Sequence, residues 1–513
     1  MSQDEIRKYV KGISACYGSI GLTLSVVFRD EVIMAEGFGV RDLGTQMPVT
    51  QDTAFSIGST TKAFTGVLAA MMVGEGKLDW DTPVRSYIPE FRLENDFADQ
   101  RASTRDLLAH RVGMPRNDFL WLSNPQVTRE EMIPRLRYLP NDRDFRTEWE
   151  YNNWMVFMGG YLAAKVAGQT WEEMVVQRLF QPLNMTRTTT GIHEALGLGN
   201  VASCYAATST GPQAYPEDVN KIIDLLAPAG AIHSTAVDMA RWLMFQLRGG
   251  KTEAGEQIVG PIPFRECRLR QFAGARTTPN GVTETYFPAS FFSIDWGFGW
   301  VSGAYRGRTS MAHTGSTMGQ TTMVYFLPDE GVGIFMSGNN PATDIKVEQF
   351  VVAFATDAVL GLEPWLDVAN SCDFPCSFVP CDKTTTTTTA EKRPHRAALD
   401  HLFRLQELRD QIPESAAPRE ALEEYVGTYY DPGYDTVTVS LTVNNTLYIV
   451  FNDIRGPLVT VAGQGDTLFA LPEYWYNLIL PLSPVPFQRN PEGQIVSLLL
   501  ALEPLAPTTF IKQ

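Results

Sequence analysis

Apolar and polar positions alternate with two different periods along this chain, and the changes of period divide it into segments. Residues 3 to 16 have apolar side chains at helical spacing, and residues 21 to 38 alternate around Arg29-Asp30-Glu31. These patterns predict a helix followed by a hairpin of two strands. From 77 to 250 the sequence is typical of helices and loops. Helical periodicity is clearest in three stretches, 153 to 167, 171 to 183 and 235 to 247.

Strand-like patterns return after residue 296. They cover Gly297-Phe298-Gly299-Trp300, then 320 to 325 and 333 to 337, and a helical pattern at 345 to 361 follows. Strands at both ends of this region with helices between them predict an α+β domain whose sheet joins distant segments.

The composition changes again beyond residue 365. Six consecutive threonines, Thr384 to Thr389, indicate a mobile linker over 382 to 394, and 396 to 412 has a helical pattern. From about residue 420, β-rich runs alternate with turns such as Asp431-Pro432-Gly433, which is typical of a small antiparallel barrel or sandwich. The runs are 436 to 443, 446 to 451, 457 to 461, 467 to 471, 476 to 480 and 495 to 502. We therefore predict a first domain of residues 1–365, a linker of 366–414 with the threonine run and a helix, and a β domain of 415–513.

Length and charge narrow the class of protein. A chain of 513 residues predicts about two or three domains, and a 44% hydrophobic content suffices for a buried core. A net charge of −16 without a large basic block argues against nucleic acid or an anionic membrane as a partner. No apolar run approaches the ~20 residues of a membrane helix.

The cysteines and the N-terminus point to an intracellular protein. The chain begins with charged residues and has no apolar signal core. Its six cysteines include a group at 372, 376 and 381, but no histidine accompanies them at metal-ligand spacing. We expect reduced thiols in a cytoplasmic protein with no metal and no cofactor.

Ser59-Thr60-Thr61-Lys62 is the only Ser-x-x-Lys sequence in the chain, and it opens an apolar run with helical spacing. Residues three apart on a helix share a face, so the lysine ammonium can reach the serine hydroxyl. A serine becomes nucleophilic when an adjacent base removes its proton, and a lysine with a lowered pKa is such a base. The four residues form a candidate active site; the alternative is a surface helix cap with an exposed lysine.

Two further motifs favour the active site. Tyr151-Asn152-Asn153 is the only Tyr-x-Asn sequence, and His313-Thr314-Gly315 is the only His-x-Gly sequence. In this order the three motifs resemble those of the serine β-lactamase and penicillin-binding-protein superfamily. The class C-like branch, with D-aminopeptidases, esterases and the mitochondrial β-lactamase-like protein, is the most similar. The stretches 107 to 115, 228 to 235 and 297 to 300 are also similar to family sequences.

The resemblance covers roughly residues 5 to 362 and implies a fold. The expected fold class is α+β: a β-lactamase/transpeptidase-like domain with an antiparallel sheet flanked by helices and a helical subdomain. The tail from about 415 resembles the lipocalin-like domain of some members, which implies a small antiparallel β-barrel. We expect its aromatic residues to pack in the core or between domains, and the alternative is a lid over the active site.

The resemblance also implies catalytic roles. Ser59 would attack a carbonyl and become acylated, while Lys62 and Tyr151 would share its proton and relay it to the leaving group. Which of the two is the base stays open, because coupled groups titrate as a unit. A half-buried structural tyrosine is the alternative for Tyr151.

The remaining site residues would bind the substrate. Asn153 would hold Lys62 and an oxygen of the substrate, although a helix cap is an alternative role. His313 and Gly315 would line the opposite wall, and the backbone N–H groups of Ser59 and Ser316 would form an oxyanion hole. A structural histidine is the alternative for His313, and His110 and His233 are expected to be structural.

The third motif departs from that of true β-lactamases, which usually carry a lysine where this chain has His313. A histidine is mostly neutral near pH 7, so recognition of anionic β-lactams is weakened and neutral acyl groups are favoured. We expect a serine hydrolase that cleaves an ester or amide bond of a small molecule or peptide. An acyltransferase or cyclase of natural-product biosynthesis is the alternative, and a non-catalytic scaffold is the third possibility. The substrate and the oligomeric state stay open.

Overall fold

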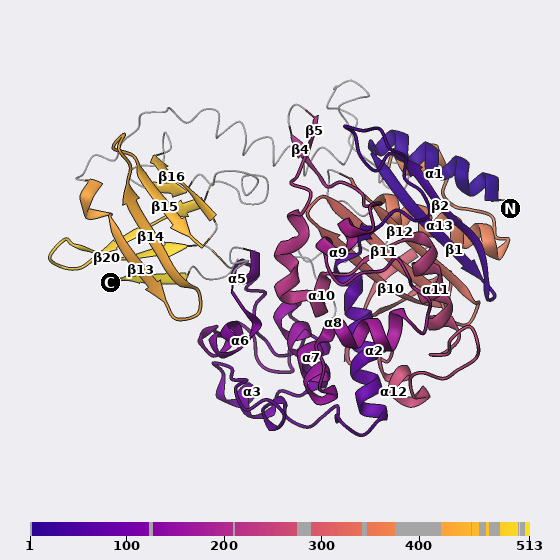
Figure 1. Cartoon of the computed structure of the whole chain (residues 1–513), viewed down its shortest axis with the longest axis horizontal. Helices are drawn as coiled ribbons and strands as arrows, with labels where there is room; N and C mark the ends of the chain where they lie inside the picture. The colour runs from indigo at the N-terminus through magenta and orange to yellow at the C-terminus, as the bar shows by residue number, and fades with distance from the viewer. Residues whose placement is uncertain are drawn as a thin grey trace.

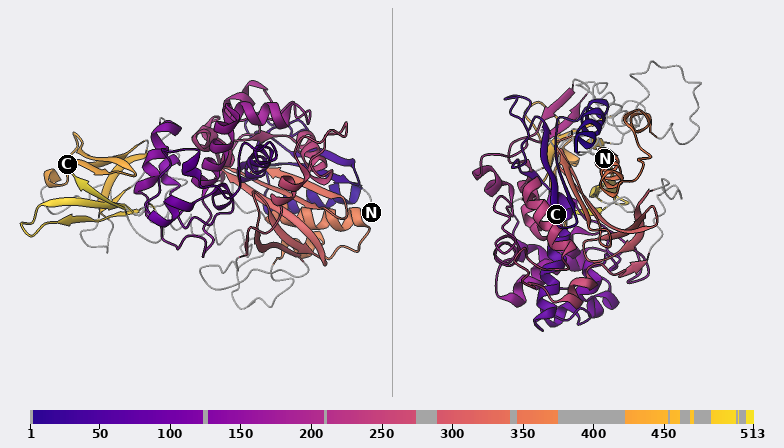
Figure 2. Two further views of the ribbon diagram at one scale, coloured as in Figure 1. Left: turned by 90° about the horizontal axis from the view of Figure 1, so that it is seen from below. Right: turned by 90° about the vertical axis from the view of Figure 1, so that its right-hand side faces the viewer.

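The computed structural model describes residues 3–122, 127–208, 211–273, 289–340, 346–374, 422–452, 454–460, 468–470, 483–500, 502 and 508–513. These residues form an eight-stranded antiparallel sheet, a layer of helices and a nine-stranded antiparallel sheet from the C-terminal part of the chain. The helices of residues 96–175 lie between the two sheets, whereas α1 (Gln3–Tyr17) and α13 (Lys346–Leu360) lie on the side away from the C-terminal sheet (Figures 1 and 2). The predicted α+β fold followed by a β-barrel is confirmed.

The eight-stranded sheet joins segments from both ends of the first domain. Its order is β2-β1-β12-β11-β10-β9-β8-β7, so the N-terminal hairpin pairs with the last strand of the domain. The strands are β1 (Gly21–Phe28), β2 (Glu31–Gly39), β7 (Phe272–Ala273), β8 (Ala289–Trp296), β9 (Val301–Tyr305), β10 (Arg308–Thr317), β11 (Gln320–Leu327) and β12 (Val332–Gly338). The predicted joining of distant segments is therefore correct.

Both faces of this sheet are covered. Along β11, Met323 and Tyr325 contribute to one hydrophobic cluster and Val324 and Phe326 to another, as the period of two in a strand requires. Helices α1 and α13 pack on the first face, and α2 and α11 belong to the cluster on the second. A sheet covered on both faces explains why every residue of β11 is buried and why the strand is apolar from Met323 to Leu327.

The helices have the following bounds. They are α1 (Gln3–Tyr17), α2 (Thr61–Gly74), α3 (Asp96–Arg101), α4 (Thr104–Leu108), α5 (Phe119–Leu122), α6 (Arg129–Met132), α7 (Asn153–Ala167), α8 (Trp171–Val175), α9 (Ile192–Gly197), α10 (Ala227–Gly230), α11 (Ala236–Leu247), α12 (Pro261–Glu266), α13 (Lys346–Leu360) and α14 (Val368–Cys372). Short 3₁₀ segments, including η1 (Gly58–Thr60) and η3 (Ile133–Tyr138), connect some of them. The expected helix over 171–183 becomes π-helical at Val176–Phe180.

The C-terminal sheet curls until its edge strands approach each other. Its order is β18-β17-β16-β15-β14-β13-β21-β20-β19, and β18 also contacts β20. The strands are β13 (Gly427–Asp431), β14 (Asp435–Leu441), β15 (Leu447–Phe451), β16 (Ile454–Thr460), β17 (Leu468–Ala470), β18 (Ser483–Val485), β19 (Phe487–Arg489), β20 (Ile495–Leu500) and β21 (Thr508–Lys512). Two short two-stranded sheets complete the strands, β3 (Phe55–Ser56) with β6 (His233–Ser234) and β4 (Tyr205–Thr208) with β5 (Gly211–Ala214).

Some expectations cannot be compared with the structure. The linker over 382–394, the helix over 396–412 and the strand over 476–480 lie outside the described residues. The domain boundaries at 365 and 415 and the lipocalin-like character of the barrel stay predictions. None of the helices in the described ranges has the length and apolar content of a membrane span.

One strand was placed wrongly. Residues 297–300 are not a strand but the bend between β8 and β9, closed by a hydrogen bond from the Gly297 N–H to the Trp300 carbonyl oxygen at 2.8 Å. Gly299 has a φ of +79°, and a Cβ there would lie 2.5 Å from the Lys62 carbonyl carbon. Glycine is required because the bend packs directly on the backbone of α2.

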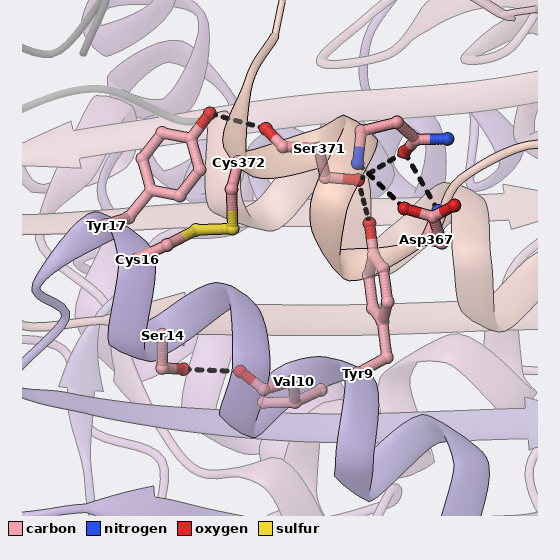
Figure 3. The surroundings of a disulfide bond; sticks show 9 residues. Tyr9, Val10, Ser14, Cys16, Tyr17, Asp367, Ser371 and Cys372 are labelled. Carbon is pink, nitrogen blue, oxygen red and sulfur yellow. Dashed lines mark hydrogen bonds between the residues drawn. A yellow bond between two sulfur atoms is a disulfide. The ribbon is translucent and has the colours of Figure 1, made fainter. Parts of the chain in front are cut away.

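The expectation of reduced thiols is wrong for one pair of cysteines. Cys16, at the end of α1, forms a disulfide with Cys372, at the end of α14 (Figure 3). Beside it the Tyr9 hydroxyl lies 2.7 Å from the Ser371 hydroxyl, and the Tyr17 hydroxyl donates to the Ser371 carbonyl oxygen. The two cysteines are 356 residues apart, so their spacing in the sequence could not reveal the pairing.

Candidate active site

The Ser59 turn is held between two parts of the fold. Ser59 lies in the 3₁₀ turn η1, and α2 begins two residues later at Thr61, slightly after the predicted helix start. The Ile57 N–H donates to the Ile232 carbonyl oxygen at 2.9 Å, beside the β3–β6 pair. Gly58 has a φ of +50°, and a Cβ there would lie 3.0 Å from the Ser316 nitrogen of β10. The turn is thus fixed against both the sheet and residues 229–232.

Two polar side chains converge on the serine. The Lys62 Nζ lies 3.0 Å from the Ser59 Oγ, and the Tyr151 hydroxyl lies 2.8 Å from the same oxygen. Ser59 and Tyr151 are half-buried, and Lys62 is buried. The structure therefore brings together the predicted nucleophile and both candidates for the base.

Lys62 has two further partners. Its Nζ lies 2.8 Å from the Asn153 Oδ1 and 2.7 Å from the Ala229 carbonyl oxygen. Burial lowers the pKa of Lys62 well below its ordinary value, and the nearby charge of Arg116 lowers it further, while Asp118 opposes the shift. Lys62 is not the exposed lysine of a surface helix.

Tyr151 lies within a group of rings. The His110 ring stacks on it at 4.5 Å between centroids, and Trp296 meets it edge-on at 5.9 Å. Burial raises the pKa of Tyr151 to about 12, which keeps its hydroxyl protonated near neutral pH. His110 was expected to be structural; its Nδ1 accepts the Asn152 N–H at 3.1 Å, and its ring forms one side of the Tyr151 environment.

Asn153, the first residue of α7, connects Lys62 to a short loop that follows Pro115. Its Nδ2 donates to the Asp118 carboxylate at 3.0 Å, which fixes its Oδ1 toward Lys62. Asp118 also accepts from the Arg116 Nε at 2.6 Å. The guanidinium of Arg116 lies over the Tyr151 ring, 5.1 Å from its centroid. The helix cap at this position is Asn152 rather than Asn153, because the Asn152 side chain accepts from the Met155 N–H.

The third motif lies on β10, beside the serine turn. A Cβ on Gly315 would lie 2.1 Å from the Ile57 carbonyl oxygen and 3.3 Å from the Ser59 nitrogen, so only glycine permits this approach. Ser316 is exposed, next to Gly315. His313 is buried, and its Nδ1 lies 2.7 Å from the Thr314 carbonyl oxygen, so the Nδ1 carries the proton.

His313 is neutral over the ordinary pH range. Burial lowers its pKa to about 3, and the charge of Lys62 contributes to the shift. His233, expected to be structural, lies in β6 and donates from its Nδ1 to the Ala231 carbonyl oxygen at 3.0 Å.

Sequence reasoning missed three contributors to this site. Arg116 and Asp118 follow the family-like stretch 107 to 115 closely in the sequence. Their place next to this stretch is the sequence feature that could have identified them as neighbours of the site. Ala229 lies within the family-like stretch 228 to 235, but it acts through its backbone oxygen, which no side-chain motif marks.

The family of the chain follows from a comparison with known protein families. The model of the family described as Beta-lactamase matches residues 6–354, more than half of the chain. The chain belongs to this family.

Curated relatives have similar sequences. The chain is 28% identical over 338 residues to the Unguisins hydrolase ungD of Aspergillus violaceofuscus, covering 63% of this chain and 59% of that protein. It is 26% identical over 329 residues to Penicillin-binding protein 4 of Amycolatopsis lactamdurans, covering 63% of this chain and 82% of that one. The chain thus spans about three fifths of the length of the ungD relative.

Solved structures share the fold. The octameric penicillin-binding protein homologue from Pyrococcus abyssi superposes with a TM-score of 0.59 at 19% identity and covers both chains fully. The D-amino acid amidase from Ochrobactrum anthropi SV3 gives 0.55 at 23% identity, covering 69% of this chain and 97% of that one. Together with the family match, these structures show that the chain has the β-lactamase fold.

Proposed function

We propose that the protein cleaves an ester or amide bond of a small molecule or peptide through an acyl-Ser59 intermediate. The observation that supports this most directly is the position of the Ser59 Oγ, 3.0 Å from the Lys62 Nζ and 2.8 Å from the Tyr151 hydroxyl. The names of the relatives, a hydrolase and an amidase, agree with it.

Lys62 is the general base in this proposal. A neutral amine has two N–H groups and one lone pair, and Lys62 has three partners. The amide oxygen of Asn153 and the carbonyl oxygen of Ala229 can only accept, so they take the two N–H groups. The lone pair then faces the Ser59 hydroxyl, the one partner with a proton to give. The lowered pKa of Lys62 favours this neutral form.

Tyr151 has the complementary role. Its pKa of about 12 keeps its proton, so it donates to the Ser59 Oγ rather than accepting from it. As Oγ attacks the substrate carbonyl carbon, its proton moves to the Lys62 Nζ. When the tetrahedral intermediate collapses, the leaving group takes the Tyr151 proton, and Lys62 reprotonates the tyrosine. Water then attacks the acyl carbon and gives a proton to the Lys62 Nζ. As the bond from the acyl carbon to the Ser59 Oγ breaks, Oγ takes the Tyr151 proton and Lys62 reprotonates Tyr151, which releases the acid product and restores the site.

The carbonyl oxygen of the substrate would lie between two backbone N–H groups, those of Ser59 and Ser316. A Cβ on Gly58 would lie 3.0 Å from the Ser316 nitrogen. The backbone of the serine turn and the backbone of β10 are therefore close enough to donate to one oxyanion. Such a donor is worth about 3–4 kcal/mol of transition-state stabilisation in known hydrolases.

The charges around the serine favour neutral acyl groups. His313 has no charge near neutral pH, and the charge of Arg116 is balanced by Asp118. The Nε2 of His313 is buried and carries no proton, so His313 offers no cation to a substrate carboxylate. A penicillin carboxylate would lack the cation that the family lysine supplies.

Acylation of Ser59 tests the proposal. The folded protein is treated with p-nitrophenyl acetate or a fluorophosphonate, and the intact mass is measured. We expect one adduct, absent in Ser59→Ala and present in the control Ser14→Ala, whose hydroxyl bonds the Val10 carbonyl oxygen on α1. A folded wild-type protein that stays unmodified by both reagents would exclude an acyl-serine mechanism.

Hydrolysis and acyl transfer differ in the fate of this acyl-enzyme. A thioester donor is offered with and without an amine or alcohol acceptor, and the decay of the acylated mass is followed. Decay without an acceptor supports the hydrolase. An acyl-enzyme that persists until an acceptor is added supports the acyltransferase instead.

A cytoplasmic location stays a prediction. The Cys16–Cys372 disulfide weighs against it, because disulfides persist mainly in oxidising compartments.

A further inference from the structure

The turn between β13 and β14 of the barrel reaches the loop beside the active site. The Tyr434 hydroxyl donates to the Asn117 Oδ1 at 2.7 Å, and both side chains are buried, with 3% and 2% of their surface exposed. The Asp431 carboxylate accepts from the Tyr434 N–H at 2.9 Å, which holds the turn in one conformation. Residues 317 positions apart in the chain thus form a buried contact between barrel and helical layer.

Other contacts seat the same turn. The Arg135 guanidinium lies 2.8 Å from the Asp435 carboxylate. A Cβ on Gly433 would lie 2.9 Å from the Leu139 Cδ2, so glycine lets the turn approach the end of η3. Figure 1 shows the barrel beside α5 and α6, the helices that flank this surface. The turn is packed on one defined surface of the helical layer.

Asn117 is central to the loop that Tyr434 contacts. It has a φ of +48°, a left-handed conformation that asparagine tolerates better than most residues other than glycine. Its Nδ2 donates to the Pro115 carbonyl oxygen at 2.9 Å, and its own carbonyl oxygen accepts from the Trp154 Nε1 at 3.1 Å. The hydrogen bond from Tyr434 satisfies the side-chain oxygen. Together these hydrogen bonds hold Asn117 in its left-handed conformation.

The neighbours of Asn117 act on the catalytic groups. Arg116 lies over the Tyr151 ring, and Asp118 fixes the amide of Asn153. A shift of Asn117 would therefore move a cation and an anion that face Lys62.

We propose that Tyr434 is a positioning residue of the active site, through which the C-terminal barrel holds residues 115–118 in their catalytic conformation. The catalytic part of this inference rests on the proposed function, whereas the contact with the loop does not. The barrel is then a structural part of the enzyme rather than an independent module.

Removal of the hydroxyl has a specific expected result. In Tyr434→Phe the Asn117 Oδ1 becomes a buried acceptor without its donor. A rearrangement of the loop that lets water donate to this oxygen then lowers the free energy. The ionisable groups that face Lys62 are Arg116, Asp118, Tyr151, His110 and His313. Water that enters beside them reduces the desolvation of Lys62, so its protonated form becomes easier to populate.

Two measurements on the full chain test the inference, with Tyr430→Phe as the matched control. Tyr430 is on the same hairpin and 42% exposed. Hydrogen–deuterium exchange of residues 114–122 is expected to rise in Tyr434→Phe and to stay at the wild-type rate in the control. The rate of Ser59 acylation is expected to fall about 10-fold, the usual scale for leaving one buried acceptor unpaired. In a plot of this rate against pH, the rise on the acidic side is expected to move to higher pH.

The outcomes separate the two proposals. If exchange in 114–122 and the pH profile both match wild type while the thermal midpoint falls, Tyr434 only packs the barrel and the inference is wrong. If wild type is never acylated, the proposed function fails, and the exchange result alone decides whether Tyr434 holds the loop. Should Tyr434→Phe not fold, Arg135→Gln is measured in its place, with a smaller change in the same direction expected and no change counting against the inference.

Discussion

The charge of Arg116 should set the pH at which Lys62 becomes a base. Lys62 acts in its neutral form, so acylation rises with pH through the pKa of Lys62 and then reaches a plateau. Arg116 lowers this pKa. In Arg116→Gln the cation that opposes protonation of Lys62 is lost. Asp118, which favours protonation of Lys62, stays in place, so Lys62 is protonated more easily. The acidic limb of the rate profile should therefore move to higher pH.

The size of the shift follows from two distances. The Lys62 Nζ and the Arg116 Cζ lie 5.0 and 5.1 Å from the centroid of the Tyr151 ring, so the two charges are at most about 10 Å apart. At about 10 Å two unit charges interact by about 1.7 kcal/mol at an effective dielectric constant of 20 and about 0.4 kcal/mol in water. Because Arg116 is 47% exposed, its effect is partly screened. We expect a shift of about 0.3 to 1 pH unit, at about 1.4 kcal/mol per unit.

The assay is the burst of p-nitrophenol release, measured from pH 5 to 10 for wild type, Arg116→Gln and the control Arg137→Gln. Arg137 is an exposed arginine of η3 that does not contribute to the pKa of Lys62. An unmoved limb, or one displaced to lower pH, would refute the assignment of Lys62 as a base tuned by Arg116. The control should superimpose on wild type.

Three further perturbations test other parts of the structure. Tyr151→Phe removes the hydroxyl 2.8 Å from the Ser59 Oγ, so acylation should slow about 100-fold in the same burst assay without a loss of thermal stability; an unchanged rate would exclude proton relay through Tyr151. Gly315→Ala would place a Cβ 2.1 Å from the Ile57 carbonyl oxygen, so both the melting temperature and acylation should fall, whereas Gly197→Ala, with open space around it, should change neither. Cys16→Ser opens a loop closed over 356 residues and should lower the free energy of unfolding by about 2–5 kcal/mol in a denaturant titration. Reductant should destabilise wild type similarly and the variant no further, and acylation at 25 °C should persist because α1 packs on the opposite face of the sheet from α2.

Periodicity predicted the long helices well but missed several strands, among them the ten-residue β10. The pattern over 153–167 coincides with α7, because an amphipathic helix of several turns repeats its signal often enough to be recognised. The two-residue strand β7 is too short to show a period and was missed, and β21 was missed as well. The bend at 297–300 resembled a strand because its aromatic residues are buried, although Gly299 there has the positive φ of a turn.

The site was predictable where side chains carry the chemistry. The single-copy motifs identified Ser59, Lys62 and Tyr151 as candidates. The fold places both the Lys62 Nζ and the Tyr151 hydroxyl within 3.0 Å of the Ser59 Oγ. Asp118 and Tyr434 could not be found in the same way. Each acts through an amide of another segment, Asn153 for the first and Asn117 for the second, and such pairs depend on tertiary contacts.

A Ser-x-x-Lys motif on a helix does not by itself make a base. An exposed lysine beside a serine is protonated near neutral pH, and its ammonium donates to the hydroxyl instead of accepting from it. Here burial lowers the pKa of Lys62, and in the neutral form that we propose, Asn153 and Ala229 accept from its two N–H groups and leave the lone pair for Ser59. These acceptors come from α7 and α10, neither of which is adjacent to the motif in sequence. In the proposed mechanism the direction of proton transfer therefore depends on the tertiary structure, and loss of either acceptor should weaken the base even with the motif intact.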